Sequence, residues 1–193
     1  WYYIFAPAGG VEKGWQLAMR SRSIYGPYEV RRVMEQGDTD INGPHQGGWV
    51  ETPQGESWFI HFQDKAMYGR IIHLNPMTWH DGWPVIGEDK DGDGCGNPVR
   101  RHAKPKVSGK HAKTTPVESD EFNTRQLGLQ WEWHANYQDL YGFTSDLGYM
   151  RLYGHVLSEE FVTFWEVPNL LLQKFPAETF TAPTKLKVSA KAA

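Results

Sequence analysis

Short strand-like runs, separated by Gly, Pro and polar residues, make up the first 90 residues of the chain. They are rich in aromatic and β-branched side chains, and no stretch of residues 1–35 keeps a 3.6-residue apolar period long enough for a helix. The runs are residues 1–6, 15–21, 49–52, 57–62 and 68–74, while residues 76–84 read as turn-rich. Residues 49–62 have the strand, turn, strand signature of a hairpin. We therefore predict an all-β chain of small antiparallel sheets, as in propeller blades or a sandwich.

The character of the chain changes at residues 100–117, which are basic, contain two prolines and offer almost nothing to bury. A linker is the natural interpretation, and a polyanion-binding patch is the alternative. Strand-like runs resume after it, at residues 131–134, 148–154, 170–175 and 177–188. We predict one domain over residues 1–112 and a second all-β domain over residues 113–193.

Composition narrows the class of protein. The 193 residues are 39% hydrophobic and 22% charged, which excludes a disordered tail, and no apolar run reaches the roughly 18 residues of a membrane-spanning helix. The net charge of −3 lacks the basic footprint of a nucleic-acid-binding protein. A single cysteine, Cys95, rules out an internal disulfide framework. Both ends of the chain lie in strand-like runs, so we expect a piece of a longer protein.

Aromatic residues are the unusual part of the composition. Nine Trp, nine Tyr and nine Phe make up 14% of the chain. Aromatic faces suit ring-shaped ligands such as sugars, whose C–H faces are apolar. The alternative, an aromatic β-core, is the better explanation from composition alone.

Two residues stand out as candidate ligands. His45 lies between Pro44 and two later glycines, on a loop where a ligand or ion could approach both backbone and imidazole. Arg70 follows Gly69 on a strand-like run, and a guanidinium can donate paired hydrogen bonds to carboxylates or vicinal hydroxyls. The alternatives are a structural histidine in a tight turn and an outward-facing strand arginine.

Two acidic segments could bind a cation. Residues 89–94 (DKDGDG) match the opening of a calcium loop, but Arg100 stands where an EF-hand needs its twelfth-position Glu, and no helical pattern flanks the loop. A polar turn is therefore favoured there, with loose cation binding as the alternative. Residues 118–121 hold three carboxylates, which either bind calcium or lie in solvent.

Several motifs in order resemble glycoside hydrolase family 43, the β-xylosidases and α-L-arabinofuranosidases. The motifs are residues 1–10, 18–29, 42–47, 69–70 and 81–84, and residues 119–122, 129–134 and 148–152 resemble the C-terminal module of that family. The resemblance implies the last part of a five-bladed β-propeller followed by the first part of a concanavalin-like β-sandwich.

The resemblance also implies a function and its residues. It implies inverting hydrolysis of xylan-type hemicellulose with release of xylose or arabinose, and we expect an extracellular or periplasmic protein. From its charge and hydropathy we expect neither nucleic acid nor a membrane as a partner. The family's catalytic carboxylates match no residue here, so none is assigned as catalytic. The resemblance implies that Arg70, His45 and Gln63 bind substrate, and that His45, Asp120 and Glu121 contact a metal, with structural calcium as the one cofactor. The alternative function is a non-catalytic carbohydrate-binding β-protein.

Overall fold

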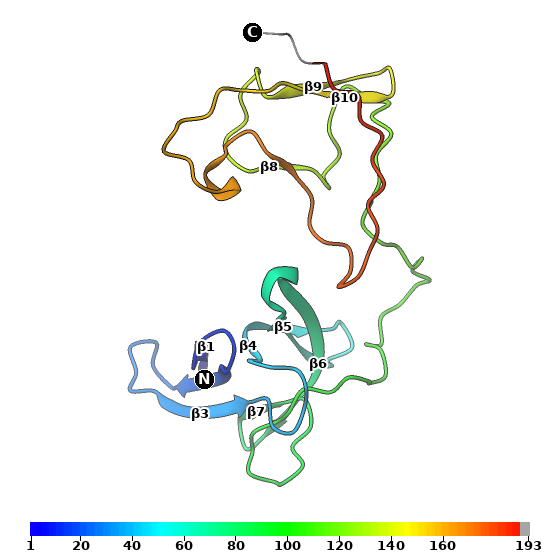
Figure 1. The fold of residues 1–193 in the computed structure, drawn as a ribbon. Helices are drawn as coiled ribbons and strands as arrows, with labels where there is room; N and C mark the ends of the chain where they lie inside the picture. Colours follow the sequence, from blue (N-terminus) through cyan, green and yellow to red (C-terminus); the bar gives the residue numbers. More distant parts are fainter. Residues whose placement is uncertain (190–193) are drawn as a thin grey trace. The chain divides into compact units, whose positions relative to one another are not determined.

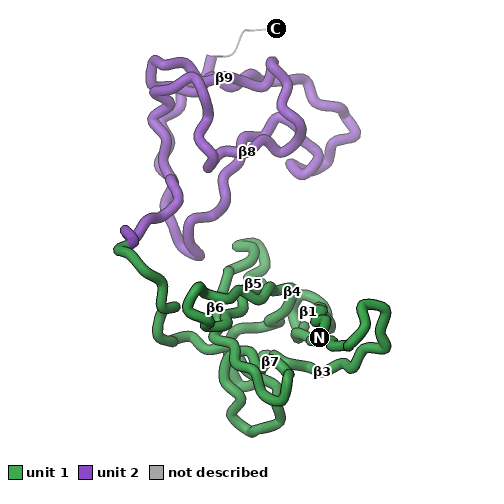
Figure 2. Tube along the Cα trace, turned by 180° about the vertical axis from the view of Figure 1, so that it is seen from behind, with its two compact units in different colours: residues 1–110 green, residues 111–193 purple. Residues whose placement is uncertain are grey.

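The computed structural model describes residues 1–189, and the chain divides into two compact units, residues 1–110 and 111–193 (Figure 2). Regular structure in the described residues is almost all β, with two single-turn 3-10 helices (Figure 1). No helix among them has the length and apolar character needed to cross a membrane.

The first sheet of unit 1 has three antiparallel strands in chain order. These are β1 (Tyr2–Ala8), β2 (Trp15–Ser21) and β3 (Glu29–Met34). Tyr2 pairs with Ser21 and Ala8 with Trp15, so β1 and β2 are in register over their whole length. The sequence predicts β1 and β2, but not β3. Four of the six residues of β3 are exposed and only Val33 and Met34 are buried, so its apolar residues do not alternate as in a half-buried strand.

The second sheet of unit 1 has four antiparallel strands, again in chain order. They are β4 (His45–Glu51), β5 (Ser57–Asp64), β6 (Arg70–His80) and β7 (Trp83–Ile86), with the 3-10 helix η1 (Ala66–Tyr68) between β5 and β6. The prediction of a turn-rich segment over residues 76–84 is wrong, because β6 runs on to His80. Only Asp81 and Gly82 form the turn, at φ values of 51° and 73°, as a tight two-residue hairpin requires.

The two sheets pack face to face around a small apolar core. Its members are Ala18, Val33, Met34, Phe59, Met77, Trp83 and Ile86. Phe5 of β1 and Phe59 of β5 meet across the interface with ring centres 5.3 Å apart. The interface fixes one face of β5 and β6 inward, and therefore decides which of their side chains lie on the other face.

Unit 2 contains two small two-stranded sheets. One pairs β8 (Glu132–Trp133) with β11 (Leu171–Leu172), and the other pairs β9 (Gly142–Ser145) with β10 (Tyr149–Leu152); η2 (Phe164–Glu166) is a single 3-10 turn. The strands predicted over residues 177–188 are absent. Their residues are exposed and pair with no strand in the described chain, and an isolated strand leaves its backbone groups unpaired.

Candidate functional site

The substrate-binding candidates lie at one end of the four-stranded sheet. His45 is the first residue of β4, Gln63 lies next to the last residue of β5, and Arg70 is the first residue of β6. The strands are antiparallel and adjacent, so these three positions come together although they span 26 positions of the chain (45 to 70, both ends counted) (Figure 1).

His45 is held in one orientation. Its Nδ1 donates to the carbonyl oxygen of Gly43 at 2.6 Å, and its side chain is almost fully buried. Glycines make room for it, because a Cβ added at Gly14 would lie 2.6 Å from His45 Nδ1. In the neutral form of the ring, this bond places the proton on Nδ1 and leaves Nε2 as the acceptor.

Phe62 connects His45 with Arg70. It pairs with His45 across β4 and β5, and the two ring centres are 5.1 Å apart. The guanidinium carbon of Arg70 lies 4.4 Å from the centre of the same Phe62 ring. A cation held over an aromatic ring loses rotamer freedom before any ligand arrives, so the exposed Arg70 is presented in a restricted position.

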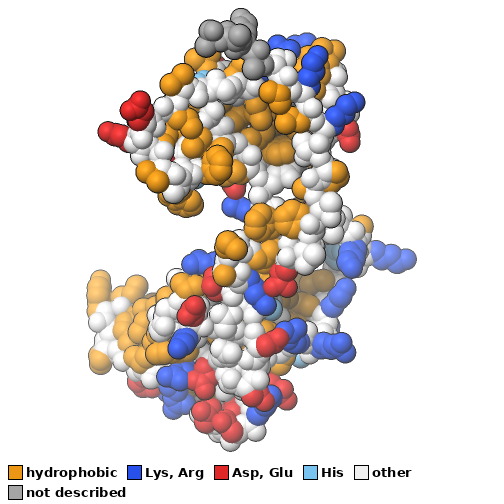
Figure 3. Space-filling model, in the orientation of Figure 1, with side chains coloured by type: hydrophobic (Ala, Val, Ile, Leu, Met, Phe, Trp, Pro, Cys, Tyr) orange, Lys and Arg blue, Asp and Glu red, His pale blue; other side chains and the backbone are white. Residues whose placement is uncertain are grey.

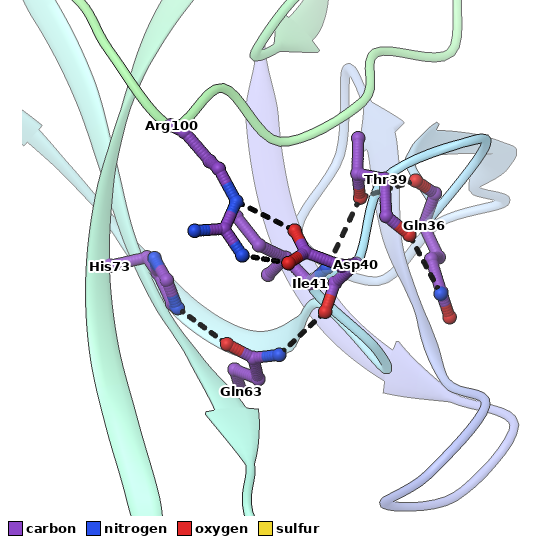
Figure 4. A network of polar contacts seen from close by, with 7 residues as sticks. All are labelled: Gln36, Thr39, Asp40, Ile41, Gln63, His73 and Arg100. Atoms are coloured by element: carbon purple, nitrogen blue, oxygen red, sulfur yellow. Dashed lines mark hydrogen bonds and ion pairs between the residues drawn. The ribbon is translucent and has the colours of Figure 1, made fainter.

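The Gln63 side chain points to the face of the sheet opposite to that of Phe62, because neighbouring residues of a strand point to opposite faces. Its Nε2 donates to the carbonyl oxygen of Asp40 at 2.7 Å, and its Oε1 accepts from His73 Nε2 at 3.1 Å (Figure 4). The Asp40 carboxylate is held in turn by Arg100, whose Nε donates at 2.7 Å. The side chain of Gln63 is buried and fully engaged in these bonds, and contact with substrate stays a prediction.

A buried polar pair on the same face escaped the sequence analysis. Asn75 Nδ2 donates to His61 Nε2 at 2.6 Å, and Asn75 Oδ1 accepts from the Val99 amide at 2.6 Å. His61 and His73 stack with ring centres 5.4 Å apart. Burial lowers the pKa of His61 to about 4, so the ring is neutral at pH 7. The sequence signal for this cluster is strand alternation. His61 and Gln63 are two residues apart on β5, as are His73 and Asn75 on β6, so the four side chains lie on one face of the sheet.

The predicted metal ligands do not gather into one site within residues 1–189. Asp120 Oδ1 accepts from the Phe122 amide at 2.7 Å, and Oδ2 accepts from Trp131 Nε1 at 2.8 Å. Glu121 is exposed beside it. In the described chain, the carboxylates that approach one another closely enough to share an ion are those of Asp89, Asp91 and Asp93. Calcium binding by Asp120 and Glu121, and contact of His45 with a metal, stay predictions.

Two carboxylates of unit 1, those of Asp38 and Asp89, are stabilised in their charged form by a cation or by backbone amides. Lys90 donates to Asp38 at 2.8 Å and lowers the pKa of that carboxyl, and amides of Gly94 and Gly92 lower the pKa of Asp89 against the opposing effect of its desolvation. A general acid of a glycosidase needs a raised pKa. Within residues 1–189, the carboxyls with a clear pKa shift all shift down, including Glu166 of unit 2.

Comparison with known proteins agrees with this architecture. Residues 1–84 match the family model "Glycosyl hydrolases family 43", and residues 119–193 match "Beta xylosidase C-terminal Concanavalin A-like domain". A putative beta-xylosidase of Xylanibacter ruminicola is 40% identical over 189 residues, which are 97% of this chain and 35% of that protein. A beta-xylosidase of Formosa agariphila is 36% identical, over 90% of this chain and 33% of its own length.

A solved structure has a similar fold. The xylan beta-1,4-xylosidase of Bacillus halodurans C-125 superposes with a TM-score of 0.67 and 26% identity, over 81% of this chain and 32% of that one. Unit 1 thus contributes blades of a five-bladed β-propeller and unit 2 part of a concanavalin-like sandwich. The chain belongs to glycoside hydrolase family 43. It spans about a third of the length of the curated relatives it matches.

Proposed function

We propose that this chain serves in an inverting glycoside hydrolase that acts on xylan-type hemicellulose and releases xylose or arabinose. The observation that carries the proposal is the placement of His45 and Arg70 on either side of Phe62 at one end of a propeller sheet. Family membership supports it, because two curated relatives are called beta-xylosidases. We propose further that the protein acts in the extracellular space or periplasm, because a polymeric substrate does not cross a membrane freely.

In the proposed reaction, this chain binds and orients the sugar. The Arg70 guanidinium, held over Phe62, donates paired N–H bonds to vicinal hydroxyls. His45 offers Nε2 as an acceptor beneath it. Inversion needs one carboxylic acid to protonate the leaving oxygen and one carboxylate to activate water, about 6.5–9.5 Å apart. We assign neither role to a residue of this chain.

The assignment of no catalytic carboxylate is tested with the purified chain alone. We expect no hydrolysis of nitrophenyl β-xyloside or nitrophenyl α-L-arabinofuranoside above the buffer rate. Turnover that disappears on substitution of one Asp or Glu of this chain would overturn the assignment.

The proposed function itself is tested in a chimera. Residues 1–193 replace the matching third of the Xylanibacter ruminicola relative, and both nitrophenyl glycosides are assayed. We expect turnover, and we expect Arg70→Ala to lower kcat/KM about 10- to 100-fold through lost charged hydrogen bonds. Arg151→Ala is the matched control, because Arg151 also lies over a ring, that of Phe143, but in unit 2. A folded chimera that hydrolyses neither glycoside would contradict the proposal.

A non-catalytic carbohydrate-binding protein is the second candidate. The assignment of no catalytic carboxylate to this chain leaves it open, because binding needs neither an acid nor a base. Calorimetric binding of xylohexaose by the chain, together with a folded but inactive chimera, would favour this function over hydrolysis. Binding that is unchanged in an Arg70→Ala variant would exclude a sugar pocket at Arg70.

A further inference from the structure

Residues 100–110 form a segment of concentrated positive charge. They hold five of the chain's 20 Lys and Arg residues and none of its 23 Asp and Glu residues. The segment therefore carries a formal charge of +5, whereas the rest of the chain carries −8. We call residues 100–110 the basic segment. In Figure 3, Lys and Arg side chains project from the right-hand edge of unit 1, and others lie elsewhere on its surface among Asp and Glu.

The basic segment contains no regular structure, but several contacts hold it against unit 1 beside the four-stranded sheet. Just before it, the Val99 amide donates to the buried Asn75. The Arg100 guanidinium donates to the Asp40 carboxylate. The His102 ring packs edge-on against the buried Trp58, with ring centres 5.3 Å apart. The Lys106 backbone amide donates to Glu56 Oε2 at 2.7 Å. These contacts attach the segment to unit 1 at several points, so its side chains are displayed from a fixed support.

The remaining cations of the segment face solvent. Arg101, Lys104 and Lys110 are exposed and form no ion pair with any carboxylate of residues 1–189. Lys106 Nζ lies 3.7 Å from Glu56 and its side chain is 83% exposed, so this pair is weak. Nine residue steps separate Arg101 from Lys110, so these side chains lie within at most about 30 Å of one another along the backbone. The result is a local group of available cations.

We propose that the basic segment binds acidic xylan, whose uronate side groups carry carboxylates. The choice of a polysaccharide rests on the proposed function, whereas the choice of an anion rests on the charges above. The spacing of charge favours this ligand over nucleic acid. DNA carries one charge per roughly 1.7 Å, and the −8 of the remaining chain repels such a dense polyanion more than a sparsely charged glycan.

Affinity electrophoresis of the full chain tests the proposal, with glucuronoxylan, neutral arabinoxylan or double-stranded DNA in the gel or binding mixture. The test variant is Arg101→Ala/Lys104→Ala/Lys110→Ala. The matched control is Lys13→Ala/Lys185→Ala/Lys187→Ala, which removes three exposed cations outside the segment and changes the net charge equally. Circular dichroism and a thermal melt establish that both variants fold like the wild type.

We expect retention by glucuronoxylan but not by neutral arabinoxylan, and weaker retention at 300 mM than at about 20 mM salt because exposed charges are screened. The test variant should lose at least about threefold in affinity, and the control should match the wild type. Equal losses in both variants, an unchanged test variant, or DNA binding as tight as glucuronoxylan binding would each overturn the proposal. The assay measures binding and not turnover. Its result therefore stands even if the chimera that tests the proposed function is inactive.

Discussion

Arg20 of β2 lies against Trp83 of β7, with its guanidinium carbon 4.2 Å from the centre of the indole ring. The same guanidinium donates to the carbonyl oxygens of Asp81 at 2.8 Å and Gly82 at 3.1 Å. Its Nε and Nη2 also donate to Glu29. One side chain of the first sheet thus satisfies the turn that joins two strands of the second.

Arg20→Ala is expected to destabilise unit 1 by about 2–3 kcal/mol, because the Arg20 side chain is only 15% exposed and makes charged hydrogen bonds. Urea unfolding followed by tryptophan fluorescence measures the change. Arg22→Ala is the control, because exposed Arg22 lies over the Trp1 ring and its side chain makes no hydrogen bond or ion pair within residues 1–189. It should stay within about 0.5 kcal/mol of the wild type. Equal effects of the two substitutions would mean that the turn contacts contribute nothing.

Stability should fall as the pH is lowered from about 6.5 to about 4. The pKa of His61 is near 4 in the folded chain and near 6.5 when unfolded, so the unfolded state binds more protons in this window. Protonated Nε2 would also face the donating amide of Asn75. Burial lowers the pKa of His73 in the same direction. The loss attributable to His61 is about 3 kcal/mol.

Urea unfolding at pH 7, 5.5 and 4 measures this dependence, with His61→Gln as the comparison. The variant is less stable at pH 7, but its stability should change less with pH than that of the wild type. A wild type and variant with parallel pH profiles would exclude His61 as the source.

Gly47 and Gly48 are adjacent but should respond differently to alanine. A Cβ at Gly47 would lie 2.1 Å from Phe59 Cε1 and 2.3 Å from the Ile60 carbonyl oxygen, whereas a Cβ at Gly48 meets nothing within 4 Å. Gly47→Ala is expected to cost about 1–3 kcal/mol through overpacking at the bulge beside His45. Gly48→Ala should be near neutral. Thermal melts of the two variants provide the comparison, and equal melting temperatures would count against the packing at this bulge.

Asp120 should stabilise unit 2 without any metal. Asp120→Ala removes the acceptor of the Phe122 amide and of Trp131 Nε1, at a cost of about 1–3 kcal/mol in excess EGTA. Calcium added to the wild type tests the separate prediction that Asp120 and Glu121 bind it, which should raise the melting temperature. Glu121→Ala is the control in EGTA, because exposed Glu121 is expected to matter only when calcium is bound.

Local pattern was enough to predict the strands that bury one face. Residues 15–19 alternate between partly exposed and buried positions, and the predicted strand, residues 15–21, has the bounds of β2. The pattern failed at β6, where Pro76 and two tryptophans nearby suggested turns. Pro76 lies opposite Trp58, and its carbonyl accepts from the Gly87 amide, so the ladder continues through it.

The site was predictable only in part, since its members come from different strands. Sequence order marks His45 and Arg70, but the register that places Phe62 between them is a property of the folded sheet. Gln63 illustrates the same point. Its neighbour Phe62 faces Arg70, and one step along a strand turns the Gln63 side chain to the other face, toward Asp40.

Two hydrogen bonds to Gly82 affect how unit 1 unfolds. The carbonyl oxygen of Gly82 accepts from Tyr3 of β1 at 2.8 Å as well as from Arg20 of β2. The hairpin of β6 and β7 cannot peel away while the three-stranded sheet remains intact. Native-state hydrogen exchange should therefore find the amides of β2 and β7 opening in a single cooperative event, with one shared dependence on denaturant.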